Sequence, residues 1–440
     1  MIENGKIRPS KSLQDALSSM LKGNEEFVMI DDQKLVYETA LDMARKSYID
    51  GNKRVLVVKG GPGTGKSVLA INLLVKLTSE NMVCSYVTKN AAPRNVYATK
   101  LSGDFRKTRI NNLFKGSGSF VESSENEFDV LIVDEAHRLN AKSGMFQNLG
   151  ENQIKEIIKA SKFSIFFIDE SQRVTLKDIG SVEEIQKYIR NANAESELME
   201  LESQFRCNGS DGYIAWLDDV LDIRKIANSD GFDLDYDIRI CDTPNEVRDL
   251  IFEKNKISNK ARLLAGYCRD WIADGKNKSD VYDITIPECN FAMNWNLGNS
   301  TTWAIYPNSV NEIGCIHTAQ GLEFDYAGVI IGNDLRYEND RVITDVKERA
   351  KTGQSIKGIN KLSKGNPEQA NKIADEIIKN TYRTLMTRGQ KGCYIYCTDK
   401  KLSDYLKRRL NQQSEIMYSI DETKTNNMMV AEDGEEYKYE

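Results

Sequence analysis

The stretch that decides the fold is VLVVKGGPGTGKSVLAINLLVKL, residues 55–77, where an apolar run leads through a glycine-rich turn into a helical pattern. Its centre, Gly60–Ser67, matches GxxxxGK[ST], and the flanking strand and helix are the context that this pattern requires. Such a turn lets backbone N–H groups wrap a phosphate chain, and the helix N-terminus adds a favourable dipole. The sequence therefore predicts a loop that binds nucleotide phosphates.

Within this loop, each side chain has an expected task. Lys66 would reach the β- and γ-phosphates of ATP, and the Ser67 hydroxyl would ligate Mg²⁺. The remaining contacts to the phosphates would come from Gly61, Gly63, Thr64 and Gly65.

Two adjacent carboxylates follow a second apolar strand, Phe128–Val133. Asp134 would hold Mg²⁺, usually through water, and Glu135 would polarise the water that attacks the terminal phosphate. His137 either couples the nucleotide site to another part of the protein or is a hydrogen-bonded structural histidine. Together with the phosphate loop, these carboxylates predict an ATP-hydrolysing site.

Short apolar runs alternate with helix-length segments, which predicts parallel sheets covered by helices on both faces. In the first half of the chain these runs are Val55–Val58, Val83–Val87, Val130–Val133 and Ser164–Ile168. In the second half they are Arg262–Tyr267, Gly314–His317, Ala327–Ile331 and Gly392–Cys397. We therefore expect two α/β domains of similar size that join near residues 195–205.

The composition argues against several classes of protein. With 40% hydrophobic and 29% charged residues, the 440-residue chain resembles an ordinary soluble protein of two or three domains. No apolar run approaches the roughly 20 residues of a membrane span. Eight cysteines without CxxC pairs, with only two histidines, argue against a zinc site or disulfide framework and favour the cytoplasm. A net charge of −6 argues against a generally basic nucleic-acid-coating protein, but it allows a local basic track.

The order of motifs resembles a superfamily 1 helicase core and, more narrowly, a bacterial helicase-like family related to the Schlafen group 3 ATPase domain. The resemblance covers about residues 12–410 and implies two RecA-like domains with the nucleotide site in the cleft between them. FVMIDDQ, residues 27–33, is similar to the Q motif, in which Gln33 would bind adenine because an amide both donates and accepts. VTKN, residues 87–90, is similar to motif Ia, whose Thr88 and Asn90 would contact the nucleic-acid backbone.

FIDESQ, residues 167–172, resembles motif III, in which the strand-end Asp169 and Gln172 would sense the γ-phosphate. Many superfamily 1 unwinding enzymes carry an aromatic base-stacking residue soon after this glutamine. This chain continues instead with Arg173-Val174-Thr175-Leu176, which argues against strong duplex unwinding.

Two further segments would bring arginines to the γ-phosphate from the second domain. LESQFR, residues 201–206, resembles motif IV with Arg206, and TYRTLMTRG, residues 381–389, resembles motif VI with Arg388 as the arginine finger. Arg383 is ambiguous and could simply pack a helix. The developing phosphoryl charge needs cations whose position depends on domain closure, so these arginines would couple hydrolysis to motion.

GCIHTAQGLE, residues 314–323, resembles motif V. The resemblance implies that His317 and Thr318 face nucleic acid and that Glu323 faces the ribose of the nucleotide. Between motifs V and VI, six basic residues accompany one acid, Glu348, and they form a possible phosphate-binding track or a solvated loop: Lys347, Arg349, Lys351, Lys357, Lys361 and Lys364.

The expected organisation begins with an N-terminal helical extension over 1–26. RecA-like domain 1 would span 27–200, and RecA-like domain 2 would span 201–415 with a polar loop or small insertion at 333–375. The acidic segment 416–440 is expected to be disordered.

These observations predict an ATP- and Mg²⁺-dependent helicase or translocase that acts on single-stranded DNA or RNA, without a membrane partner. A second hypothesis is a regulatory ATPase whose conformational cycle controls a partner protein, such as a nuclease in a defence system. The missing aromatic residue after Gln172 favours this second hypothesis.

Overall fold

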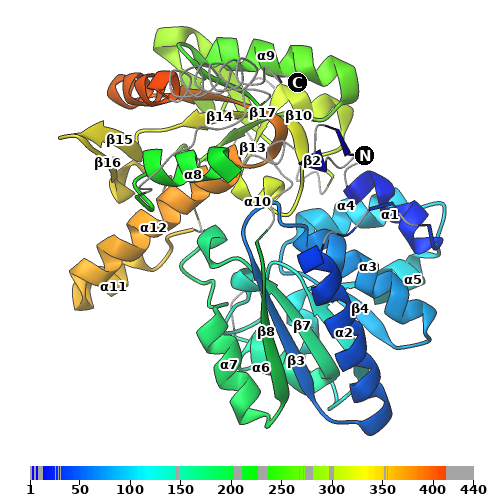
Figure 1. Ribbon diagram of the computed structural model, residues 1–440. Helices are drawn as coiled ribbons and strands as arrows, with labels where there is room; N and C mark the ends of the chain where they lie inside the picture. Colours follow the sequence, from blue (N-terminus) through cyan, green and yellow to red (C-terminus); the bar gives the residue numbers. More distant parts are fainter. Residues whose placement is uncertain are drawn as a thin grey trace, which may run out of the picture.

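The computed structural model describes residues 2–3, 6–7, 13–24, 26–27, 29, 31–144, 148–202, 211–225, 236–266, 268–270, 272, 281–296, 302–350, 353 and 355–412. Within these residues, two largely parallel sheets, one from each half of the chain, lie one above the other with helices around them (Figure 1). The predicted α/β class with two RecA-like parallel-sheet units is confirmed. None of the described helices is long and apolar enough to cross a membrane.

The first unit is built on a sheet whose described strands all run parallel in the order β5-β4-β6-β7-β3-β8. Every apolar run predicted for this half of the chain lies in one of these strands or overlaps it. The exposed edge strand β8 was not predicted, because its sequence ESELMEL contains no apolar run. The strand bounds are β3 Arg54–Gly60, β4 Cys84–Val87, β5 Phe114–Lys115, β6 Phe128–Val133, β7 Ser161–Ile168 and β8 Glu195–Leu201.

Alternate residues of β3 point to opposite faces of this sheet and enter separate apolar cores. Val55 and Val57 pack in the core that contains helices α6 (Gln153–Ala160) and α7 (Val182–Asn191). Leu56 and Val58 belong to the core on the other face. That core takes in α1 Leu13–Leu21, α2 Asp31–Asp50, α3 Lys66–Ser79, α4 Ala91–Leu101 and α5 Lys107–Leu113.

The second unit is built on a sheet with the described order β11-β12-β13-β10-β14-β17-β9, in which only β11 is antiparallel to its neighbour. Helices α8 (Asp211–Val220), α9 (Pro244–Ser258) and α12 (Pro367–Met386) surround it, with a further helix over 400–412 (Figure 1). The strand bounds are β9 Asp237–Cys241, β10 Ala261–Ala265, β11 Ile284–Ile286, β12 Phe291–Trp295, β13 Glu312–Gly314, β14 Phe324–Ile331 and β17 Gly389–Cys397.

One predicted strand of the second half is wrong over most of its length. The run Gly314–His317 was expected to be a strand, but β13 ends at Gly314 and the one-turn helix α10 (Ile316–Ala319) follows. The cause is a local cap, because the Thr318 hydroxyl accepts a hydrogen bond from the backbone N–H of Cys315 at 3.0 Å. A side chain that bonds the backbone in this way competes with strand pairing.

The segment 333–375 was expected to be either a long loop or a small insertion, and it is not a long loop. Strands β15 (Leu335–Glu338) and β16 (Arg341–Thr344) form an antiparallel hairpin, and helix α11 (Ile359–Gly365) precedes α12. The two residues at the hairpin turn, Asn339 and Asp340, both have positive φ, 51° and 57°. Residues of this type suit a two-residue hairpin turn, so the signal was present in the sequence.

The two units also share an apolar core and ion pairs. The core cluster that contains Leu69 of α3 continues to Val329 of β14. Asp15 of α1 lies 2.5 Å from Lys260 of the second unit and 2.8 Å from Lys100 of the first. The N-terminal helix therefore helps to hold the second unit against the first.

We predict that Gly314→Ala destabilises the second unit. A Cβ at this position would lie 2.3 Å from Cη2 of Trp303, whose ring is fully buried and has little room to move. Overpacking of this kind costs about 1–3 kcal/mol of unfolding free energy, which urea denaturation measures. Gly365→Ala is the matched control, because no described atom other than those of its chain neighbours and its own helix backbone lies within 4 Å of the added methyl group. Equal stability of the two variants would contradict the prediction.

Candidate nucleotide site

The phosphate loop connects β3 to α3 at the carboxyl edge of the first sheet. Gly63 and Gly65 have φ of 83° and 85°, a region that favours glycine. No described side chain caps the N-terminus of α3, so the first backbone N–H groups of the helix remain available to an anion. The glycines predicted to cradle phosphates therefore have a backbone geometry that suits this task.

Lys66 and Gln33 both lie against this loop. The Lys66 ammonium donates to the carbonyl oxygens of Gly60 at 2.7 Å and Gly61 at 2.6 Å, and it lies 3.9 Å from Asp169. The Gln33 amide donates to the carbonyl oxygen of Thr64 at 3.0 Å, which places it beside the loop.

Asp134 joins the phosphate loop to the end of β6. The Ser67 hydroxyl donates to its Oδ2 at 2.6 Å, so the two expected Mg²⁺ ligands are in direct contact. The Tyr86 hydroxyl of β4 donates to the same oxygen at 2.6 Å, a contact that sequence reasoning missed. Burial and the charge of Glu135 raise the pKa of the Asp134 carboxyl above its ordinary value.

These donors fit a Mg²⁺ ion that arrives with a nucleotide. The described residues contain no cluster of three or more His, Cys, Asp or Glu side chains that could hold a metal ion. Mg²⁺ commonly takes only one or two protein ligands and completes its shell with water and phosphate oxygens. A hydroxyl and a carboxylate, as supplied by Ser67 and Asp134, match this pattern.

Glu135 is held in an unusual conformation at the end of β6. It is buried and has a positive φ of 54°. Its Oε2 lies 3.0 Å from Nε2 of His137. Burial raises the pKa of this carboxyl, but His137 and the charges of Arg388 and Lys66 outweigh burial and leave the pKa below its ordinary value. A carboxylate that stays ionised can accept a proton.

A hydrogen-bonded chain crosses from the phosphate loop to the second unit. The Gln172 amide donates to Asp169 at 2.6 Å, and Nη2 of Arg388 donates to Oε1 of Gln172 at 2.9 Å. Arg388 is only 1% exposed and also donates to the carbonyl oxygen of Thr384 at 3.0 Å. The structure thus brings four of the predicted residues together in the order Lys66, Asp169, Gln172 and Arg388.

Arg383 forms a second contact between the units. Its guanidinium pairs with Asp218 and donates to the Ser171 hydroxyl at 3.0 Å. Burial raises the pKa of Asp169, but the charges of Lys66 and Arg383 outweigh it and lower this pKa. Arg383 therefore contributes charge near motif III as well as packing.

Glu323 accepts a hydrogen bond from Gln390 at 2.7 Å, within the second unit. Arg206 lies outside the described residues.

Two of the residues predicted to face nucleic acid, Asn90 and Thr318, make structural hydrogen bonds, and Thr88 is buried. Thr88 is fully buried, and its hydroxyl has no hydrogen-bond partner in the described part of the chain. Asn90 caps α4 and donates to the carbonyl oxygen of Gln320 at 2.7 Å. Thr318 caps α10, and burial together with the charge of Arg138 lowers the pKa of His317 to about 3.

We predict that Arg388→Ala lowers ATP turnover by roughly 10²-fold or more and changes nucleotide affinity only several-fold, because the charge acts chiefly on the transition state. Steady-state kinetics and nucleotide titration measure the two effects. Arg341→Ala is the control, since this arginine of the hairpin is 77% exposed. Equal losses in affinity and rate would mean that Arg388 supports the bound ground state or the fold.

Comparison with known proteins agrees with the order of motifs. Residues 53–399 match the family described as Schlafen group 3, DNA/RNA helicase domain. An uncharacterized protein of Saccharomyces cerevisiae, YPL245W, is 26% identical over 399 residues, which cover 80% of this chain and 84% of the yeast protein. Superfamily 1 membership and the bacterial grouping stay predictions. The chain belongs to the Schlafen group 3 helicase-domain family.

Proposed function

We propose that this protein hydrolyses ATP with Mg²⁺ between its two units and uses the motion of the units to move along, or remodel, single-stranded nucleic acid. The observation that carries this proposal is the chain from Lys66 through Asp169 and Gln172 to Arg388. Lys66, which would bind the γ-phosphate, lies at one end of this chain, and Arg388 of the second unit lies at the other. A change in the position of the second unit would therefore alter the contacts of the phosphate-binding residue.

Within this proposal, Lys66 binds the β- and γ-phosphates and Glu135 orients and deprotonates the attacking water. Bound Mg²⁺, held by Ser67 and through water by Asp134, would supply positive charge against the phosphate oxygens. Gln33 would bind adenine and Glu323 the ribose. Arg206 would add a second cation beside Arg388.

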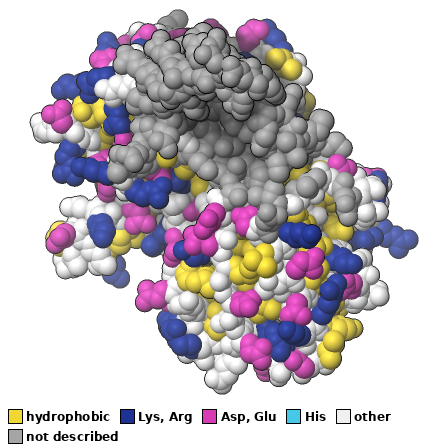
Figure 2. All heavy atoms as spheres, viewed as in Figure 1, with side chains coloured by type: hydrophobic (Ala, Val, Ile, Leu, Met, Phe, Trp, Pro, Cys, Tyr) yellow, Lys and Arg dark blue, Asp and Glu magenta, His cyan; other side chains and the backbone are white. Residues whose placement is uncertain are grey.

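The nucleic-acid surface would lie where motifs Ia and V face each other. The hydrogen bond from Asn90 to Gln320 joins the start of α4 to the end of α10. Asn90, His317 and Thr318 would therefore form one surface, while the buried Thr88 would shape it from beneath. On the face shown in Figure 2, basic and acidic side chains are interspersed over the first unit, which favours a local contact over a broad basic surface.

The regulatory ATPase is the second candidate, and one observation favours it. The backbone oxygen of Arg173 accepts a hydrogen bond from Asn380 at 3.1 Å, and the N–H of Leu176 donates to Ser355 at 2.7 Å. The segment after Gln172 is thus tied to the second unit and offers no aromatic ring for base stacking. Motion of the units would then act on a partner protein.

The domain limits 27–200 and 201–415 and a cytoplasmic location belong to the same proposal. The limit between residues 200 and 201 lies one residue before the end of the first sheet, because Leu201 is the last residue of β8.

We predict that Glu135→Gln keeps ATP and Mg²⁺ bound while hydrolysis fails, because the amide preserves shape but cannot accept a proton. Lys66→Ala should instead lose both most turnover and much of the binding, because it removes the charge that faces the phosphates. Phosphate release and nucleotide binding are measured for both variants. Normal hydrolysis by Glu135→Gln, or turnover by Lys66→Ala within about twofold of wild type, would refute the assigned site.

Fewer of the six basic residues between 347 and 364 are available to a phosphate backbone in the structure than the sequence suggests. Arg349 is buried and donates to Asp334 at 2.8 Å, so it is not available to a phosphate backbone. Lys351 lies outside the described residues. Lys357, Lys361 and Lys364 are exposed on or beside α11, with no charged partner among the described residues, and α11 projects from the second unit beside α12 (Figure 1).

We predict that replacing Lys357, Lys361 and Lys364 with Ala weakens single-strand binding about equally for all sequences. Because each neutralised phosphate releases counterions, the log–log salt slope should flatten by roughly one to two units. Basal ATP hydrolysis should stay near wild type. Replacing the exposed Lys159, Lys400 and Lys401 is the control of equal charge. An unchanged slope and affinity would leave α11 as solvated surface and favour the regulatory ATPase.

A further inference from the structure

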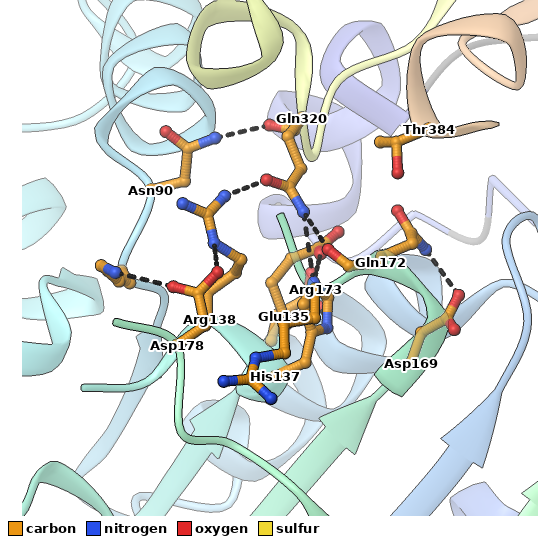
Figure 3. Close-up of polar contacts among 12 residues, drawn as sticks. Asn90, Glu135, His137, Arg138, Asp169, Gln172, Arg173, Asp178, Gln320 and Thr384 are labelled. Atoms are coloured by element: carbon orange, nitrogen blue, oxygen red, sulfur yellow. Dashed lines mark hydrogen bonds and ion pairs between the residues drawn. The ribbon is translucent and has the colours of Figure 1, made fainter. Parts of the chain in front are cut away.

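Gln320 lies at the point where three segments of the first unit meet the second unit (Figure 3). It is fully buried and follows α10 directly. Its backbone oxygen accepts a hydrogen bond from Asn90 at 2.7 Å, and its Oε1 accepts one from Nη1 of Arg138. Its Nε2 lies 3.3 Å from the backbone oxygen of Gln172 and 3.2 Å from Nε2 of His137.

The orientation of the Gln320 amide is fixed by its neighbours. A guanidinium can only donate, so the amide oxygen faces Arg138, and a carbonyl can only accept, so the amide nitrogen faces Gln172. Arg138 is itself held by Asp178 at 3.0 Å, and Asp178 also pairs with Lys89 at 3.0 Å. The amide therefore presents an N–H group to His137.

His137 Nε2 consequently has two neighbours with opposite needs. Oε2 of Glu135, 3.0 Å away, requires a hydrogen on this nitrogen, whereas the amide of Gln320 requires its lone pair. A neutral imidazole nitrogen supplies only one of the two. The other ring nitrogen, Nδ1, has no hydrogen-bond partner among the described residues. Donation by Gln320 and a hydrogen bond from His137 to Glu135 would thus exclude each other, and in this structure Oε2 of Glu135 has no hydrogen-bond partner among the described residues.

We propose that Gln320 is a positioning residue that releases Glu135 through His137 when the second unit docks. Docked, Gln320 donates to Nε2 of His137, the imidazole carries its one proton on Nδ1, and the Glu135 oxygen is free to accept from the attacking water. With the units apart, the imidazole exchanges protons with solvent, carries its proton on Nε2 and occupies that oxygen. This inference rests on the proposed role of Glu135 as the base.

The hydrogen bond from Asn90 connects Gln320 to the proposed nucleic-acid surface. The segment that carries Gln320 is tied through its backbone oxygen to the first residue before α4, which belongs to the proposed nucleic-acid surface. Gly321, which follows, has φ of 80°, and a Cβ there would lie 2.7 Å from Cγ of Pro93 in α4. Because this turn packs closely on α4, a nucleic-acid strand bound at the start of α4 would favour the docked position of Gln320.

The test is a double-mutant cycle on turnover, measured at saturating ATP and Mg²⁺ with single-stranded oligo(dT) and oligo(U) present. Gln320→Met keeps the side chain near its length but cannot donate, so His137 should hold Glu135 permanently. We expect kcat to fall by about tenfold or more, with little change in the KM for ATP. In His137→Ala nothing holds Glu135, and adding Gln320→Met to this variant should cause no further loss.

The cycle separates positioning from structural support. If Gln320 only stabilised the fold or the interface, its loss would be equally large with and without His137, and that additive result would overturn the inference. An unchanged kcat in Gln320→Met would overturn it as well. Thermal melts identify a variant that does not fold, and Gln320→Leu, also unable to donate, then takes its place. If wild type did not hydrolyse ATP, or if Glu135→Gln hydrolysed it normally, the proposed function itself would fail.

Discussion

The structure depends on a buried polar chain that neither unit can complete alone. Lys66, Asp169 and Gln172 belong to the first unit, while Arg388 comes from the end of α12 in the second. A buried guanidinium or carboxylate is costly unless it is paired and hydrogen-bonded. A change in the position of the second unit therefore changes the electrostatic environment of the phosphate loop. For this reason residues of both sheets form a single site.

The parallel sheet explains why the chemistry gathers at one edge. Three strands of the first sheet, β3, β6 and β7, end next to the phosphate loop, Asp134 and Asp169 respectively. Parallel neighbours end at the same edge, so residues far apart in sequence meet there. The second unit then contributes Arg388 and Gln320 from loops that face this edge, which places proposed hydrolysis and proposed nucleic-acid contact within one hydrogen-bonded network (Figure 3).

Much of this arrangement could be predicted from local sequence. The apolar runs of β3, β6, β7, β14 and β17 are clear enough to predict strands. The glycines of the phosphate loop indicate the backbone conformation of that turn. Edge strand β8 could not be found, because its charged residues face solvent and no run is left to detect. The hairpin β15–β16 was missed although Asn339-Asp340 is a hairpin turn pair. Tyr86, Arg138 and Gln320 have roles set by contacts 48 to 230 residues away, which no spacing rule reveals.

The most direct test of the account is the rate of ATP hydrolysis by the wild-type protein with Mg²⁺, measured without nucleic acid and then with single-stranded DNA, single-stranded RNA and duplex. We expect hydrolysis to rise when at least one single strand is added, because a bound strand stabilises the docked position in which Arg388 and Gln320 complete the site. Hydrolysis that proceeds but does not respond to any of these strands would contradict the coupling to nucleic acid.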